Sequence, residues 1–362
     1  MAGRGTRATA TDFNNIQSTL NSVLGLGSGT QGYGQTVTSS QVASGAIITV
    51  AQWTTLRADL VKCRTHQTNL AVANAPANVS ANRGGACQTL EVITSSTVIS
   101  EDIRDQYNLF TNGSPGTIGI NAERTLANAA QLSAATAPSG VTNPSQYAGA
   151  WGVNASSTRY LRQIYTVKFP GYTHAGGLVV SAADHIRCFF NAGGKIQFTS
   201  TRSGTANNTK DTDWTNMLSG MGNFIFAAST SSVSGTTNPG NGGTTPGSSI
   251  GYFQATPSPA YQTLVSVAST VSKYTENRFT VEVATSGTNA LLFRLTWADN
   301  DAGDYPVVPT PPLPGPLQDE SVNGNAASRM ESSCFIVRPN VSATVDVPAP
   351  TASAGAYVVS AT

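Results

Sequence analysis

The chain has 362 residues, of which only 11% are charged, and its formal net charge is +1. A globular protein usually carries about 25% charged residues, so this low content is more typical of extracellular or particle-forming β proteins than of cytosolic enzymes. The near-neutral balance gives no general attraction to nucleic acid or to an anionic membrane, and no apolar run approaches the ~18 residues that span a bilayer. We therefore expect neither a nucleic-acid partner nor membrane insertion.

The segment TDFNNIQSTLNSVLG, residues 11–25, predicts the first helix. Its apolar side chains recur at helical spacing, so they share one face. Thr11 or Asp12 can cap its start, and Gly25 is placed to end it.

A second helix is predicted from Thr49 onwards. Thr49 and Gln52 have the T-x-x-Q spacing of a capping box, and apolar residues then recur on one helical face. Two short amphipathic helices joined by a Gly- and Ser-rich connection cannot bury much surface alone, so they need a covering surface from the rest of the chain or from another subunit. We expect residues 1–100 to form an attachment region that a partner covers. The side chains predicted to face that partner are Phe13, Ile16, Leu20, Trp53, Leu56 and Leu60.

Residues 101–157 are predicted to form a connecting region, within which the Ala-rich segment 120–137 favours a helix. From 158 to 362, runs rich in β-branched and aromatic residues predict strands, interrupted by one helical turn near Trp214. The predicted fold class is therefore mainly β: a jelly-roll-like antiparallel β-sandwich with a small N-terminal helical region. The Gly/Pro-rich segments at 234–249 and 305–318 are predicted to be surface loops.

The stretch ADHIRCFFNAGGKIQFTSTR, residues 183–202, is predicted to be a core β-hairpin. Apolar residues alternate along both expected strands, and Asn191 to Gly194 supplies residues that tolerate a tight turn. His185 and Arg187 would then face outward, where a ligand could contact them. Because no partner carboxylate or nucleophile is recognisable nearby, the structural interpretation is favoured.

No motif predicts a cofactor or a catalytic residue. Residues 27–32 fit G-x-G-x-x-G, but they follow a helix instead of a strand, so they predict a turn. The histidines and cysteines are too scattered for zinc-ligand spacing, and the cysteines are interpreted as reduced core thiols. The chain is therefore not predicted to be an enzyme. A hydrolase with a carboxylate pair drawn from Asp211, Asp213, Glu282 and the loop at Asp299 is the weakest alternative.

The loop WADNDAGD is the best candidate for a cation site. Asp299, Asp301 and Asp304 could offer carboxylate oxygens to calcium. The loop does not follow the EF-hand template, and Asp and Asn readily occupy turns, so a solvated turn is favoured over a metal site.

Several distinctive segments follow one another: SSQVASGAIITVAQWTTLRADLVKCRTHQ, ADHIRCFFNAGGKIQFTSTRSG, TKDTDWTNMLSGMG, LLFRLTWADNDAG and DESVNGN. In this order they resemble virion structural proteins of tailed bacteriophages, above all those of cyanobacterial and marine phages. The resemblance runs from about Phe13 to about Pro350. It implies a tail, neck, baseplate or fibre component that is assembled in the host cytoplasm and located in the virion. It also implies contacts with other virion proteins and with copies of itself, and it assigns no active-site residue.

Two alternatives remain open for a particle protein. One is a capsid decoration protein. The other is a carbohydrate-binding receptor-recognition module at a fibre tip, in which aromatic rings stack on a host surface glycan. The candidate sugar contacts are Tyr252, Tyr261, Tyr274 and Tyr305.

Overall fold

The computed structural model divides the chain into two units, each assembled from segments that are distant in the sequence. The structure describes residues 9–29, 31–68, 145–152, 159–206, 208–235, 247–248, 250–256, 259–271, 274–301, 305–306, 317–318, 320–323, 327–337 and 345–360. Unit 1 comprises the described residues within Met1–Ala137, Pro170–Gly194 and Arg338–Ala349. Unit 2 comprises those within Pro138–Phe169, Lys195–Val337 and Pro350–Thr362. The helix predicted at 120–137 lies outside the described residues.

This division differs from the predicted succession of three regions, 1–100, 101–157 and 158–362. Two segments interrupt the β region and belong to the same unit as the N-terminal helices. Side-chain hydrogen bonds explain their placement, because Arg187 donates to the carbonyl oxygen of Leu26 and Gln35 bonds the backbone of Asp346. Contacts between residues this far apart leave no mark on local sequence patterns.

Two capped helices open unit 1. Helix α1 spans Ala10–Leu24 and ends at Gly25, as predicted. Its N-cap is Thr9, not the predicted Thr11 or Asp12. The Thr9 hydroxyl accepts a hydrogen bond from Asp12 N, and the Asp12 carboxylate accepts one from Thr9 N. Helix α2 spans Val50–Thr68. Its predicted capping box is confirmed by reciprocal bonds between Thr49 and Gln52, 2.8 Å and 3.3 Å long.

The predicted hairpin at 183–202 is wrong in its first half. Ala182–Asn191 forms helix α6, which follows the short strands β3, Tyr172–Thr173, and β4, Val179–Val180. The hydroxyl of Ser181 accepts a hydrogen bond from Asp184 N and caps this helix. Every residue from His185 to Asn191 is buried, so the apparent alternation of apolar residues did not reflect one exposed face and one buried face.

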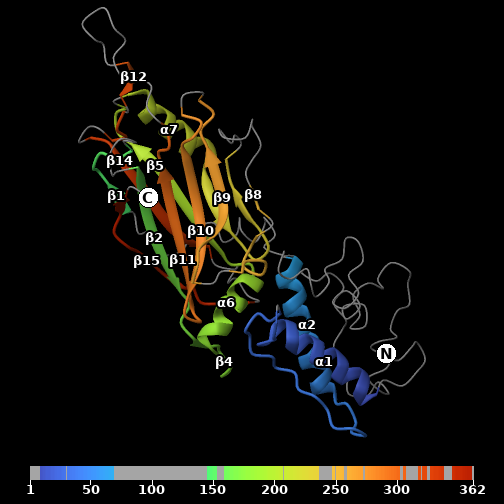
Figure 1. The fold of residues 1–362 in the computed structure, drawn as a ribbon. Helices are drawn as coiled ribbons and strands as arrows, with labels where there is room; N and C mark the ends of the chain where they lie inside the picture. Colours follow the sequence, from blue (N-terminus) through green and yellow to red (C-terminus); the bar gives the residue numbers. More distant parts are fainter. Residues whose placement is uncertain are drawn as a thin grey trace, which may run out of the picture. The chain divides into compact units, whose positions relative to one another are not determined.

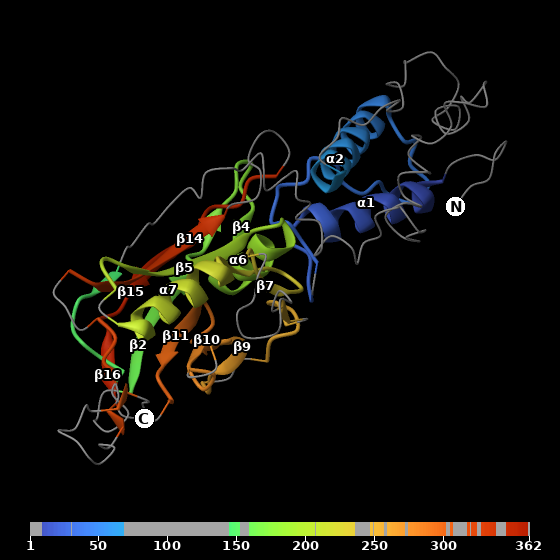
Figure 2. The same ribbon diagram turned by 90° about the horizontal axis from the view of Figure 1, so that it is seen from above.

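Unit 2 contains an antiparallel β sandwich, which confirms the predicted fold class (Figures 1 and 2). One sheet has the order β1-β14-β5-β6-β7-β8, and the other has the order β15-β2-β11-β10-β9, with β16 also paired to β2. The strands of the first sheet are β1 Ser145–Tyr147, β5 Lys195–Ser203, β6 Asn223–Phe226, β7 Ser231–Val233, β8 Gly247–Ser248 and β14 Arg329–Val337. Those of the second are β2 Tyr160–Lys168, β9 Gln262–Ala268, β10 Arg278–Ser286, β11 Ala290–Ala298, β15 Thr351–Ala354 and β16 Val358–Ser360.

Unit 2 also contains a short strand pair and a helix where a surface loop and a single helical turn were predicted. The ends of the Pro-rich segment pair as β12, Tyr305–Pro306, and β13, Leu317–Gln318, while most of the segment at 234–249 lies outside the described residues. The single helical turn predicted near Trp214 is a longer helix, α7, which spans Thr209–Met221 and ends at Gly222.

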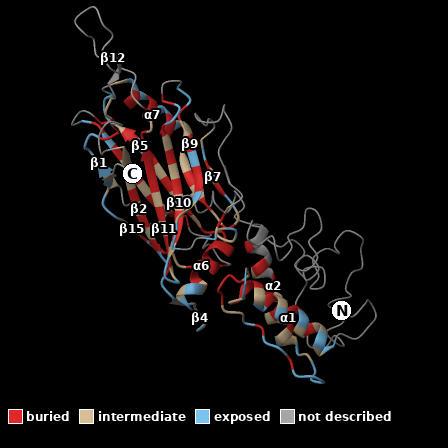
Figure 3. Cartoon of the chain, in the orientation of Figure 1, coloured by how far each residue is buried: buried red, intermediate tan, exposed pale blue. Residues whose placement is uncertain are grey.

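Aromatic side chains join the two sheets in the core. Figure 3 shows that buried residues run along the long strands of both sheets. The ring centroids of Tyr165 on β2 and Phe198 on β5 lie 5.4 Å apart, and Phe198 lies 4.9 Å from Phe293 on β11. The indole N–H of Trp297 donates to the hydroxyl of Ser200 at 3.0 Å. Burial alternates along the long strands, as expected when one face of each sheet packs on the other.

Candidate functional site

The six apolar side chains predicted to face a partner lie inside unit 1. Each of them is at most 2% exposed in the single chain: Phe13, Ile16, Leu20, Trp53, Leu56 and Leu60. The rings of Phe13 and Trp53 meet edge to face, with centroids 5.2 Å apart. The two helices therefore cover each other's apolar faces with help from the rest of the unit, and the prediction that these side chains form an open docking surface is wrong.

An extended segment, residues 33–42, is held by side chains from both helices. The Asp59 carboxylate on α2 accepts hydrogen bonds from the backbone N–H groups of Thr38 and Ser39, at 2.9 Å and 2.7 Å. The Asn14 amide on α1 bonds both backbone groups of Val42, at 2.8 Å and 2.9 Å. These bonds take the role that a sheet neighbour usually has, so the segment is fixed without being a strand.

Arg187 fixes the glycine-rich loop that follows α1. Its guanidinium is buried, donates to the carbonyl oxygens of Leu26 and Gln31, and pairs with Asp184 at 2.6 Å. Gly32 has a φ of +104°, and a Cβ there would lie 2.0 Å from the carbonyl oxygen of Leu26. The G-x-G-x-x-G match is thus a structural turn, as predicted, whereas the prediction that Arg187 faces outward is wrong.

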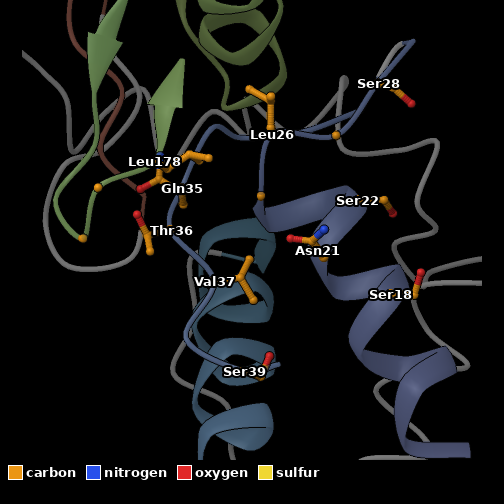
Figure 4. Close-up of a pocket in the computed structure, with 14 residues that line it drawn as sticks. Ser18, Asn21, Ser22, Leu26, Ser28, Gln35, Thr36, Val37, Ser39 and Leu178 are labelled. Atoms are coloured by element: carbon orange, nitrogen blue, oxygen red, sulfur yellow. The ribbon is translucent and has the colours of Figure 1, made fainter. Parts of the chain in front are cut away.

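These fixed segments surround a pocket of about 650 Å³ in unit 1 (Figure 4). Its lining is uncharged and consists mostly of small or polar residues. They come from α1, from the loop and extended segment after it, and from the turn between β3 and β4: Ser18, Asn21, Ser22, Gly25, Leu26, Gly27, Ser28, Gln35, Thr36, Val37, Ser39, Gly176, Gly177 and Leu178. Hydroxyl, amide and glycine backbone groups can bind a neutral polar partner, but they supply no acid or base.

The three histidines contact different backbone groups. The ring nitrogens of His185 lie 2.5 Å and 2.8 Å from the carbonyl oxygens of Pro170 and Pro348, so the predicted outward orientation of His185 is also wrong. His66 lies 3.1 Å from the carbonyl oxygen of Ala192, and burial lowers its pKa to about 4. His174 lies beside Thr36. These contacts are structural.

The cysteines that the structure describes are buried thiols, as predicted: Cys63, Cys188 and Cys334. Burial raises the pKa of the Cys188 thiol to about 12. A thiol that stays protonated at neutral pH is a poor nucleophile, so this group is inert.

Two aspartates of the loop predicted as a cation site, Asp299 and Asp301, form a buried cluster in unit 2 with Lys210 of α7. Lys210, in the first turn of α7, places its Nζ 2.9 Å from Asp299 Oδ2 and 3.1 Å from Asp301 Oδ2. The three side chains are 1%, 0% and 7% exposed. The preferred interpretation as a solvated turn is therefore wrong, and the positive charge beside these carboxylates is an ammonium group of the chain itself. Asp304 lies outside the described residues.

One ammonium group cannot balance all the carboxyl groups around it. Burial, reinforced by the neighbouring Asp301, raises the pKa of Asp299 to about 9 despite the opposing effect of Lys210. Asp213, on the same helix as Lys210, accepts a hydrogen bond from Ser269 at 2.6 Å, and burial raises its pKa to about 6. Burial thus favours the protonated, uncharged form of Asp299.

The other predicted hydrolase carboxylates are engaged separately. The Arg202 guanidinium binds both carboxylate oxygens of Asp211, at 3.0 Å and 2.7 Å, and both side chains are at most 1% exposed. Glu282 forms a two-bond pair with Arg294, at 2.6 Å and 3.0 Å. No sequence signal near Arg202 or Lys210 indicated either buried pair.

The predicted sugar contacts have different surroundings. Tyr274 is only 2% exposed, and its hydroxyl lies 2.5 Å from that of Thr209, so its assignment as a sugar contact is wrong. Tyr261 is half-buried, with the Arg294 guanidinium 4.1 Å from its ring centroid. Tyr252 packs on Phe253. The side chain of Tyr305 lies outside the described residues.

None of the helices in the described part of the chain combines the length and apolar character needed to cross a bilayer. Comparisons of the chain with protein-family models, with curated proteins and with solved structures found no match.

Proposed function

We propose that the chain is a structural component of a tailed-phage virion, in the tail, neck, baseplate or a fibre. In this proposal unit 1 attaches to another virion protein and the β sandwich of unit 2 supplies a rigid body. The low charge and the order of distinctive segments support a particle protein. The pocket in unit 1 is the observation that carries the proposal. The six apolar side chains that were predicted to make the attachment are buried inside the unit, so the pocket is the surface left to receive a partner.

The pocket suits an extended polypeptide segment of a neighbouring protein. Its lining offers hydroxyl, amide and glycine backbone groups without a charge, and a peptide backbone is likewise neutral and rich in donors and acceptors. The backbone of Val37, in the extended wall of the pocket, makes no hydrogen bond to any part of the chain that the structure describes. Asp59, Asn14 and Arg187 hold the walls in place, so binding costs little ordering of the pocket.

Buried polar groups elsewhere also support a structural role. Arg202 and Asp211 bind each other inside unit 2, and the buried Cys188 thiol in unit 1 stays protonated. Such groups fix a fold, and a particle subunit needs a defined shape more than it needs mobile catalytic groups.

A substitution that fills the pocket tests attachment. We expect Asn21→Trp to lower incorporation into particles by about tenfold or more, equivalent to about 1.4 kcal/mol of binding free energy. Asn21 is an exposed residue of α1 whose amide lies in the pocket wall, so the larger ring occupies the space without disturbing the core (Figure 4). Incorporation is measured by complementing a phage that lacks the protein and quantifying the chain in purified particles.

The matched control is Asn15→Trp, on the same helix. Asn15 is also exposed but does not line the pocket. Both variants should keep the circular dichroism spectrum and melting temperature of the native chain. Equal incorporation of the two variants would contradict the assignment of this pocket as the attachment site.

A further inference from the structure

Lys210 and Asp299 form a buried pair with the composition of an amide-forming site. The Lys210 Nζ lies 2.9 Å from Asp299 Oδ2, at side-chain exposures of 1% and 0%. The second oxygen of the Asp299 carboxyl group, Oδ1, is buried and accepts or donates no hydrogen bond within the described residues. A third group, Asp301, lies 3.1 Å from the same nitrogen.

We propose that Lys210 and Asp299 join spontaneously in the folded chain to form an isopeptide bond, with Asp301 carrying the protons. The three groups supply an amine, a carboxyl carbon and a base, which are the only parts that this condensation needs. The proposal does not depend on where the protein acts, so it stands or falls independently of the proposed function.

The protons and bonds balance without another reactant. Asp301 takes one proton from the Lys210 ammonium group, and the neutral amine nitrogen bonds to Cγ of the protonated Asp299 carboxyl group. A second proton passes from the nitrogen, through Asp301, to the Asp299 hydroxyl group, the C–O bond breaks, and water leaves. The product is an amide. Asp301 keeps the first proton, and its hydroxyl group can donate a hydrogen bond to the new amide oxygen.

The surroundings favour the neutral forms that react. Burial raises the pKa of Asp299 to about 9, so its carboxyl group is protonated and has a better leaving group than a carboxylate. Transfer of a proton from Lys210 to Asp301 replaces two buried charges by two neutral groups, which a low-dielectric interior favours. The Asn277 amide donates to Asp301 Oδ2 at 3.3 Å and holds this carboxylate beside Lys210.

The pair is shielded from bulk water, and buried aromatic side chains lie on the same helix and beside Lys210. Trp214 lies one turn after Lys210 on α7, and its ring centroid is 5.2 Å from that of Trp151, with both side chains fully buried. The ring centroid of the buried Tyr274 is 5.9 Å from Lys210 Nζ. Holding an amine beside a carboxyl group in one buried site raises their effective concentration, which reaches on the order of 10⁵ M or more where the reacting atoms are well aligned.

The bond would tie the start of α7 to the end of β11, two positions 89 residues apart. A covalent link of this kind restricts the unfolded chain in the way that a disulfide does, but it needs no oxidising compartment.

Intact mass spectrometry of the denatured full chain tests the proposal directly. The native protein is expected to be lighter than its sequence mass by one water molecule. Trypsin should then release residues 203–273 linked to residues 295–329 as one branched peptide, because trypsin does not cleave after an acylated Lys210. Lys210→Met and Asp299→Ala should each have the full sequence mass, and Asp301→Asn should form the bond more slowly or not at all.

Lys168→Met is the matched control, because Lys168 is an exposed lysine in the same unit. It should still lose one water molecule. A native chain with its full sequence mass would overturn the proposal even if no variant folds. A loss of water that maps to another position, such as a succinimide at a different aspartate, would overturn it as well.

Discussion

Replacing Arg202 with methionine is expected to lower the free energy of unfolding of unit 2 by about 3 to 5 kcal/mol. The substitution removes the counter-charge of Asp211, whose carboxylate is fully buried and cannot reach water. It also removes the guanidinium donors to Ser328 and to the Thr205 carbonyl oxygen. Urea unfolding followed by tryptophan fluorescence measures the effect, because Trp214 and Trp297 are buried in this unit.

Arg294→Met provides the matched comparison. Arg294 and Glu282 form an equally well-aligned pair, but their side chains are 27% and 15% exposed, so solvent screens the charges that remain. The expected loss is about 1 kcal/mol or less. Equal losses of unfolding free energy for Arg202→Met and Arg294→Met would show that burial does not make the Arg202–Asp211 pair more costly to break.

Trp53→Ala is expected to destabilise unit 1 by about 3 to 5 kcal/mol, because it leaves a cavity where a buried ring packs against Phe13. Helix content is measured by circular dichroism during urea unfolding. The three other tryptophans, Trp151, Trp214 and Trp297, belong to unit 2, so the fluorescence of this variant reports on unit 2 alone. We expect the fluorescence transition to keep its native midpoint.

The control for Trp53→Ala is Ile47→Ala, in the same unit. Ile47 is 80% exposed, so its truncation should change the free energy of unfolding by about 0.5 kcal/mol or less. If Trp53→Ala lowered particle incorporation while leaving the helical signal native, Trp53 would be a direct contact with a partner, and its placement in the core would be wrong.

Local signals in the sequence were sufficient for elements that have their own start and stop residues. Gly25 ends α1, and the Thr49 and Gln52 pair starts α2, both as predicted. The long strands of the sandwich were also predicted, because burial alternates along them and the sequence shows that period.

Helix α6 shows where periodicity fails. Cys188 and Phe190 fit a strand pattern, but Phe189 between them is equally buried, so there was no exposed face to distinguish a period of 2 from one of 3.6. The cap formed by Ser181 and Asp184 was the signal that could have identified the helix.

Most of the site could not be predicted, because its contacts join distant positions. Lys210 meets Asp299 across 89 residues, and Arg187 reaches Leu26 across 161. A lysine in an amphipathic segment normally extends into solvent, and only the tertiary fold places Lys210 among carboxyl groups.

The central claim, that the chain is part of a virion, is tested most directly by immunogold electron microscopy. The antibody is raised against residues 195–337 and applied to purified phage particles. We predict label confined to the tail, neck, baseplate or fibres of intact particles. Absence of label on intact particles, together with no reaction of the antibody with dissociated particles, would contradict the claim.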